Sequence, residues 1–182
     1  MVDTQLIVEI EHVPQSIEEF VALRDRIADT PQGGAAIMIV ALLSYAEDQV
    51  LGEQALTVAV DRERLQEAAD GYRGWQVRKR PLQLIRRQIL DSPHIPRSYF
   101  LGTSPESGYR LPEPPLRIEC RSGPYSGDVE DGTYRVFVTS SGAPSARPVT
   151  LHRNQRGFWK AYEWSSLLLG VVPPSVHEPD DL

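Results

Sequence analysis

The chain has 182 residues, of which 41% are hydrophobic and 24% charged, and its formal net charge is −6 at pH 7. This composition is ordinary for a globular protein, so we expect the chain to bury a core without metal or disulfide staples. The acidic total argues against indiscriminate coating of DNA, and the single cysteine, Cys120, excludes an intramolecular disulfide.

Targeting and membrane signals are not evident in the sequence. The stretch 1–11 alternates apolar and acidic residues without a basic region, which is unlike a secretory signal. The longest apolar run, 33–43, is far shorter than the ~20 residues that span a membrane. We therefore expect a cytoplasmic protein without a membrane partner, folded as a single structural unit over 1–182.

Helix signals dominate residues 14–92. Four helix starts are predicted, at the Ser16 and Glu19 capping box, at Thr30-Pro31, at Asp48 and at Pro81. The second helix is apolar on nearly every face from 35 to 45, which places it at the centre of the core. In the fourth, Arg86 and Arg87 lie off the apolar stripe.

The pattern changes from helical to alternating in residues 109–172. Leu116, Ile118 and Cys120 alternate with charged residues, which is typical of a strand with one covered face. Three more strands are expected at 134–138, 148–152 and 158–164, the last two joined by a hairpin loop at 154–157. Helices first and strands afterwards predict an α+β fold. We expect a helical N-terminal half (14–92) packed on a small antiparallel β-sheet or barrel formed by the C-terminal half (109–172), followed by a flexible tail at 173–182.

The short patterns that indicate catalysis or a bound metal are missing. The four histidines do not stand at ligand spacing from one another or from the cysteine, so no metal site is predicted. There is no G-x-S-x-G elbow and no Walker A or Rossmann glycine pattern, so neither a catalytic residue nor a cofactor is assigned. A dyad of Cys120 and His152 stays open.

A basic segment at 72–100 carries the leading functional hypothesis. Residues 71–97 hold seven Lys or Arg against Asp91 alone, whereas residues 1–70 hold four Arg against fourteen Asp or Glu. Aromatic residues lie between these cations, a combination found in protein hot spots and in sites for single-stranded nucleic acid. The predicted partner-binding residues are Arg73, Trp75, Arg78, Lys79, Arg80, Arg86 and Arg87.

Three interpretations of the basic segment stay open. Its arginines can pair with the acidic first half and form a solvated face, or they can bind a protein partner or nucleic acid. Between the two macromolecules a protein is favoured. The leading hypothesis is therefore a non-enzymatic binding or accessory protein that presents the basic segment to a macromolecular partner.

A pocket between the two halves is the alternative. Arg97 and Arg147 each adjoin a proline in a turn-rich segment, where an arginine can donate to backbone carbonyls and lock two loops together. If Arg97, Glu106 and Arg147 converge instead, they form an anion pocket of the kind found at such junctions. The chain is then a small enzyme or an anion-binding protein.

Three segments give the chain a likeness to a known family. They are P-R-S-Y at 96–99 with the Gly, Pro and Glu of the loop that ends at Tyr109, S-S-G-A-P-S-A-R-P at 140–148, and 159–173 from Trp159 through Glu163 to Leu168 and Pro173. In this order, over roughly residues 31–174, they resemble an uncharacterised bacterial domain family, a domain of unknown function. The resemblance implies a shared fold and carries no activity with it.

Overall fold

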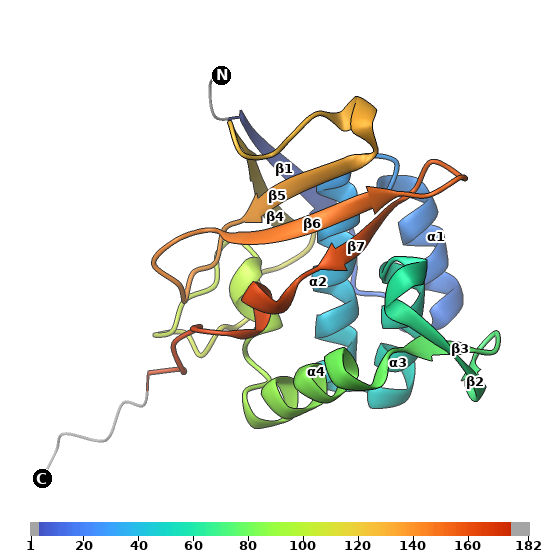
Figure 1. Cartoon of the computed structure of the whole chain (residues 1–182). Helices are drawn as coiled ribbons and strands as arrows, with labels where there is room; N and C mark the ends of the chain where they lie inside the picture. Colours follow the sequence, from blue (N-terminus) through green and yellow to red (C-terminus); the bar gives the residue numbers. More distant parts are fainter. Residues whose placement is uncertain (1–3, 176–182) are drawn as a thin grey trace, which may run out of the picture.

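Four α-helices and seven β-strands form the part of the chain that this computed structural model describes, residues 4–175 (Figure 1). The helices are α1 (Ile17–Ile27), α2 (Pro31–Glu47), α3 (Gln49–Ala59) and α4 (Lys79–Asp91). The strands are β1 (Thr4–Ile10), β2 (Leu65–Tyr72), β3 (Trp75–Val77), β4 (Leu116–Ser122), β5 (Thr133–Val138), β6 (Arg147–Arg153) and β7 (Trp159–Glu163). Short 3₁₀ helices are η1 (Arg62–Arg64), η2 (Pro96–Tyr99), η3 (Val129–Asp131) and η4 (Ser165–Leu168). The predicted α+β class is confirmed.

Five strands pair into one antiparallel sheet in the order β1-β4-β5-β6-β7. The four strands predicted in the C-terminal half are β4 to β7, so that half of the prediction is confirmed. Strand β1 was not predicted. It forms one edge of the sheet and pairs with β4 from Thr4 opposite Ser122 to Ile10 opposite Leu116. Its alternation places Val8 and Ile10 in the core.

Helix α2 is the centre of the molecule. It contacts all five strands of the sheet and the three other α-helices, and Figure 1 shows it passing behind the sheet. Fourteen of its 17 residues are buried, because a helix that is apolar on every face leaves no side for solvent. At Gly34 the helix approaches the backbone of Trp159 so closely that a Cβ atom would collide with it. One hydrophobic cluster therefore joins the helices to the sheet.

The predicted helix caps form. The Ser16 hydroxyl accepts the N–H of Glu19 at 3.1 Å, and the Glu19 carboxylate accepts the N–H of Gln15 at 2.8 Å. The Thr30 hydroxyl accepts from Gly33 at 3.0 Å, and Asp48 accepts from the first turn of α3.

Two details of the half expected to be helical are different in the structure. Helix α4 begins at Lys79, not at Pro81, because the first helical N–H groups have no intrahelical partner and a proline is tolerated among them. A β2–β3 hairpin also stands between α3 and α4. Its turn places Arg73 at φ 53° and Gly74 at φ 84°, and an arginine in the left-handed region is not a recognisable turn signal.

The β6–β7 loop forms as predicted. The Asn154 side-chain oxygen accepts the N–H groups of Arg156 and Phe158, both at 3.0 Å, and Gly157 supplies the left-handed residue at φ 87°. Of the predicted flexible tail, residues 176–182 lie outside the described residues. Ser175 lies inside them, and its N–H donates to the carbonyl of Pro105 at 2.9 Å.

Between residues 4 and 175 no helix combines the length and the apolar character that crossing a membrane requires.

Candidate functional site

The predicted partner-binding residues lie on two consecutive elements. Arg73 is at the tip of the β2–β3 hairpin and Trp75 begins β3, and the hairpin leads directly into α4 (Figure 1). Arg78 is the N-cap of α4, Lys79 and Arg80 are its first residues, and Arg86 and Arg87 follow on its outer face. All six cations are exposed and Trp75 is half-buried. The side chains are therefore accessible to a partner.

Intramolecular pairing of the basic segment is limited. Of the seven cations in 71–97, only Arg97 forms an ion pair within the described part of the chain, with Glu47 at 3.7 Å. Arg78 donates its Nε to the backbone carbonyl of Glu63 at 2.8 Å, which leaves its charge without a carboxylate. Ion pairing with the acidic first half thus accounts for one of these seven cations.

Positive charge at the start of α4 opposes the helix dipole. Arg78, Lys79 and Arg80 occupy the N-cap and the first turn, where there is no acidic residue and no side-chain cap. Helix N-termini favour negative side chains by about 0.3–1 kcal/mol each, as in α1, whose first turn holds Glu18 and Glu19. The helix forms despite this charge because its inner face buries Ile85 and Ile89. The charges at the start of α4 therefore do not stabilise the helix.

The three residues of the alternative anion pocket each have separate surroundings. Arg97 pairs with Glu47, whereas Arg147 donates to the carbonyl of Gly170 at 3.2 Å, as expected for an arginine that locks a loop. Glu106 is exposed in the loop before Tyr109. No ion pair joins it to either arginine, all three residues being among those described.

A pocket does lie between the helical and β halves, but at a different place. It has a volume of about 630 Å³ and opens between the end of α3, the β2–β3 hairpin and the β6–β7 loop. Its polar and aromatic lining comprises Thr57, Asp61, Arg62, Trp75, Arg153, Asn154, Gln155, Arg156 and Lys160. This cationic pocket brings together residues that are far apart in sequence, and Trp75 is the one predicted site residue among them.

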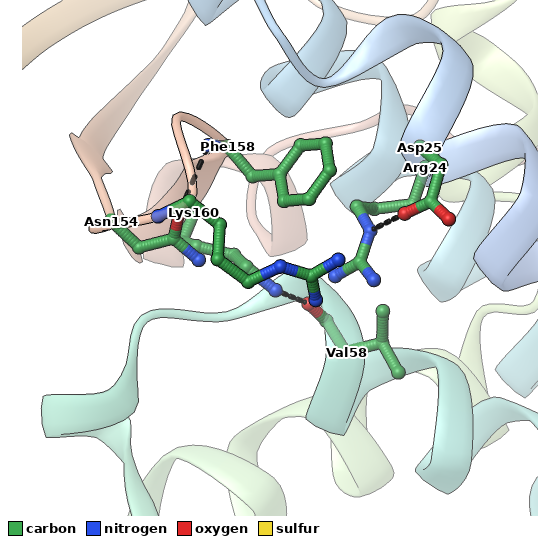
Figure 2. Close-up of polar contacts among 7 residues, drawn as sticks. Arg24, Asp25, Val58, Asn154, Phe158 and Lys160 are labelled. Atoms are coloured by element: carbon green, nitrogen blue, oxygen red, sulfur yellow. Dashed lines mark hydrogen bonds and ion pairs between the residues drawn. The ribbon is translucent and has the colours of Figure 1, made fainter.

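Lys160 is the innermost of the cations of this pocket. It projects from β7 toward α3, and its ammonium donates to the carbonyl of Val58 (Figure 2). That carbonyl belongs to the last turn of α3, where a cation is favourable for the helix dipole. The pKa of Lys160 is nevertheless lowered to about 8, chiefly by burial and in addition by the charges of Arg24 and Arg156, against the opposing effects of Asp61 and Asp25.

Two arginines, Arg24 and Arg156, contact the ring of Phe158 near Lys160. The Arg24 side chain is buried, its Nε pairs with Asp25 at 2.7 Å, and its guanidinium lies 4.5 Å from the centre of the Phe158 ring (Figure 2). Arg156 lies 5.1 Å from the centre of the same ring. These cation–π contacts fix the loop at the mouth of the pocket.

Within residues 4–175 the cysteine and the histidines form no metal-binding group, and Cys120 and His152 lie apart. Cys120 is fully buried, and burial, aided by Glu119, raises its pKa to about 12. It pairs with Val138 at one end of β5, whereas His152 pairs with Thr133 at the other end and stacks on Tyr162, so the open Cys120–His152 dyad does not form. Residues 4–175 contain no group of three His, Cys, Asp or Glu placed to hold a metal ion.

Sequence reasoning missed the cations of the pocket. Arg153, Arg156 and Lys160 are visible as basic residues around the predicted hairpin loop. Arg62 lies in the same pocket because the end of α3 contacts β7, where the N–H of Asp61 donates to the carbonyl of Ala161 at 2.8 Å. No local sequence pattern predicts this tertiary contact.

Comparisons with known proteins agree with the resemblance seen in the sequence. Neither the curated proteins nor the solved structures contain a match to this chain. A family model described as a domain of unknown function, DUF6935, matches residues 12–175, and thus α1 to α4, β2 to β7 and the cationic pocket. The chain belongs to the DUF6935 family.

Proposed function

We propose that this protein is a non-enzymatic binding or accessory protein that contacts an acidic protein partner in the cytoplasm through its basic segment. The observation that supports the proposal is the start of α4, where Arg78, Lys79 and Arg80 are exposed, have no carboxylate partner among residues 4–175 and oppose the helix dipole. A feature that costs stability without an internal compensation is expected at a functional surface.

An acidic partner compensates this cost. Its carboxylates neutralise the three cations and interact favourably with the positive end of α4 as well. Trp75, with Arg62 5.5 Å from its ring centre, and Tyr72 beside Arg73 supply half-buried aromatic surface next to the charges. Arginine with tryptophan or tyrosine is the usual composition of an interface hot spot.

A protein is favoured over nucleic acid because negative charge is mixed into the same surface. Glu67 and Asp70 are exposed on β2, beside the hairpin tip that presents Arg73. Carboxylates at this position repel a continuous phosphate backbone, whereas they can match a protein surface of alternating charge.

The test is a pull-down with Lys79→Glu/Arg80→Glu, which keeps the Arg78 hydrogen bond. The matched control is Arg110→Glu/Arg135→Glu, an equal charge change at two exposed arginines outside the basic segment. We expect wild type and control to retain the same protein from nuclease-treated lysate and the test variant to lose it. The isolated pair should then dissociate at raised salt. Equal recovery by all three proteins would contradict the proposal.

Stability separates lost binding from lost folding in this experiment. Acidic residues at the start of α4 favour the helix dipole, so the double variant should unfold at higher urea concentration, with a gain of about 1 kcal/mol. A variant that is more stable and yet does not bind cannot owe its defect to misfolding.

A further inference from the structure

The cationic pocket holds an excess of positive charge that residues 4–175 do not neutralise. Arg62, Arg153, Arg156 and Lys160 line it, and Asp61 is the one carboxylate in its lining. None of the four cations forms an ion pair with any of the carboxylates that the structure describes. The Asp61 carboxylate accepts the N–H of Glu63 at 3.0 Å, so part of its capacity is already used.

The cations are held close together by the fold. Lys160 is anchored to Val58 in the depth of the pocket, and Arg156 is placed by the cap that Asn154 provides for the loop. Like charges in a partly buried place repel each other and disfavour the charged lysine. An anion between them removes this repulsion, which is the arrangement expected of an anion site.

The donors suit a phosphate group. Arg153 and Arg156 are exposed at the mouth, where their planar guanidinium groups can each donate two hydrogen bonds to one phosphate. The side-chain oxygen of Asn154 is used by the loop, and its amide nitrogen donates to none of the described residues. These donors and Lys160 line the same pocket.

The opposite wall suits a flat ring. Trp75 is half-buried and lines the pocket, whereas the other two tryptophans are buried, with 2% and 4% of their surface exposed. The guanidinium of Arg62 lies 5.5 Å from the Trp75 ring centre, and Val60 and Leu65 add apolar surface beside it. A half-buried indole that lines a pocket next to an arginine is a platform on which nucleobases can stack.

We propose that the cationic pocket binds a nucleoside monophosphate, with the phosphate held by Arg153, Arg156 and Lys160 and the base stacked on Trp75. The volume of about 630 Å³ lies in the range of sites for ligands of this size. Recognition uses side chains of three elements and no glycine-rich loop, which is why sequence motifs for phosphate binding do not reveal it.

This site is separate from the surface that binds the acidic partner. The two share Trp75, but Arg78, Lys79 and Arg80 do not line the pocket. The double variant Lys79→Glu/Arg80→Glu should therefore keep nucleotide binding while it loses the partner. Each proposal can fail without the other.

The test is a calorimetric titration of the full chain with AMP, GMP, CMP and UMP, compared with adenosine and inorganic phosphate. At least one monophosphate should bind at least about ten-fold more tightly than adenosine or phosphate, because both walls contribute. Arg156→Gln should weaken that nucleotide by about ten-fold or more. Trp75→Leu should weaken the nucleotide by about ten-fold and leave the weak binding of phosphate unchanged.

Controls decide between the site and a general affinity for anions. Arg135→Gln, an exposed arginine on β5 outside the pocket, should bind the nucleotide like wild type. Lys160→Gln removes a contact with α3, so Arg156→Gln, at an exposed loop position, is the decisive variant. The proposal is overturned if no monophosphate binds, if phosphate or citrate binds as tightly as the nucleotide, or if Arg156→Gln has no effect.

Discussion

The hydroxyl group of Tyr109 occupies the space that a Cβ atom on residue 142 would need, so Gly142 is the residue that allows Tyr109 to pack there. The same hydroxyl donates to the carbonyl of Val172 at 2.6 Å, and the N–H of Val172 donates to the carbonyl of Gly142 at 2.9 Å. Nearby, the Ser140 hydroxyl donates to that of Ser98 at 2.8 Å. The segments 96–109, 140–148 and 159–173, on which the resemblance in the sequence was based, therefore converge on one packed region.

Gly142→Ala should destabilise the protein. The added methyl group meets the Tyr109 hydroxyl and the Val171 side chain, and overpacking of this kind costs about 1–3 kcal/mol. Urea unfolding followed by circular dichroism would measure the loss. An unchanged midpoint would show that the Tyr109 hydroxyl does not occupy this position.

Tyr109→Phe provides the matched second variant. Alone it removes the hydrogen bond to Val172 and should cost about 1 kcal/mol. Combined with Gly142→Ala it also removes the atom that the methyl group meets first, so the double variant should be more stable than the sum of the single effects predicts. If the two losses of stability simply add, the Tyr109 hydroxyl and the methyl group at residue 142 are not in contact.

Arg73→Asn should stabilise the β2–β3 hairpin. Arg73 has φ 53°, a left-handed conformation that asparagine adopts more readily than arginine. The variant loses the exposed contact of Arg73 with the Tyr72 ring at 5.5 Å, so the expected net gain is about 0.5 kcal/mol in urea unfolding. Arg86→Asn, on the exposed face of α4, serves as control and should be slightly destabilising. A destabilised Arg73→Asn would mean that the side-chain contact outweighs the backbone strain.

Local signals explain which elements were predictable. The caps at Ser16, Thr30 and Asp48 act within three residues, and β4 carries its alternation in its own sequence. Strand β1 carries a local alternation too, but this was used only as evidence against a secretory signal, and its pairing with β4 spans all four helices in sequence. Strand β2 was not predicted, because its residues are half-buried or exposed and show no apolar face.

The candidate sites divide in the same way. A run of cations such as Arg78-Lys79-Arg80 is visible in the sequence, but its position at the start of a helix depends on where α4 begins. The cationic pocket depends on β7 meeting the end of α3, which is a tertiary contact. For Arg97 and Arg147 the neighbouring prolines indicate a turn but not the direction of the side chain: Arg97 pairs with Glu47 of α2, and Arg147 donates to the carbonyl of Gly170.

Cys120 should resist thiol reagents in the folded protein. Its side chain has no exposed surface, and burial raises its pKa to about 12, so the reactive thiolate is scarce at pH 8. Labelling with a disulfide reagent at pH 8 should be at least about 100-fold slower in buffer than in urea. Since Cys120 is the only cysteine, Cys120→Ser gives the blank. Rapid labelling without urea would contradict the buried position.

Lys160 should make the protein more stable as the pH rises above 8. Its pKa is about 8 in the folded protein and 10.5 as the ordinary value, so between these pH values the unfolded chain binds more protons than the folded one. Raising the pH then favours the folded state, by about 1 kcal/mol between pH 8 and 9 from this group.

Lys160→Met isolates the contribution of this lysine. Cys120 and the buried tyrosines have raised pKa values and act in the opposite direction, but they are common to both proteins and cancel in the difference. Urea unfolding of the two proteins from pH 7 to pH 9.5 should show a constant difference up to about pH 8 and then a gain for wild type relative to the variant. A difference that does not change with pH would mean that Lys160 titrates alike in both states, and the ammonium would then not be desolvated against α3.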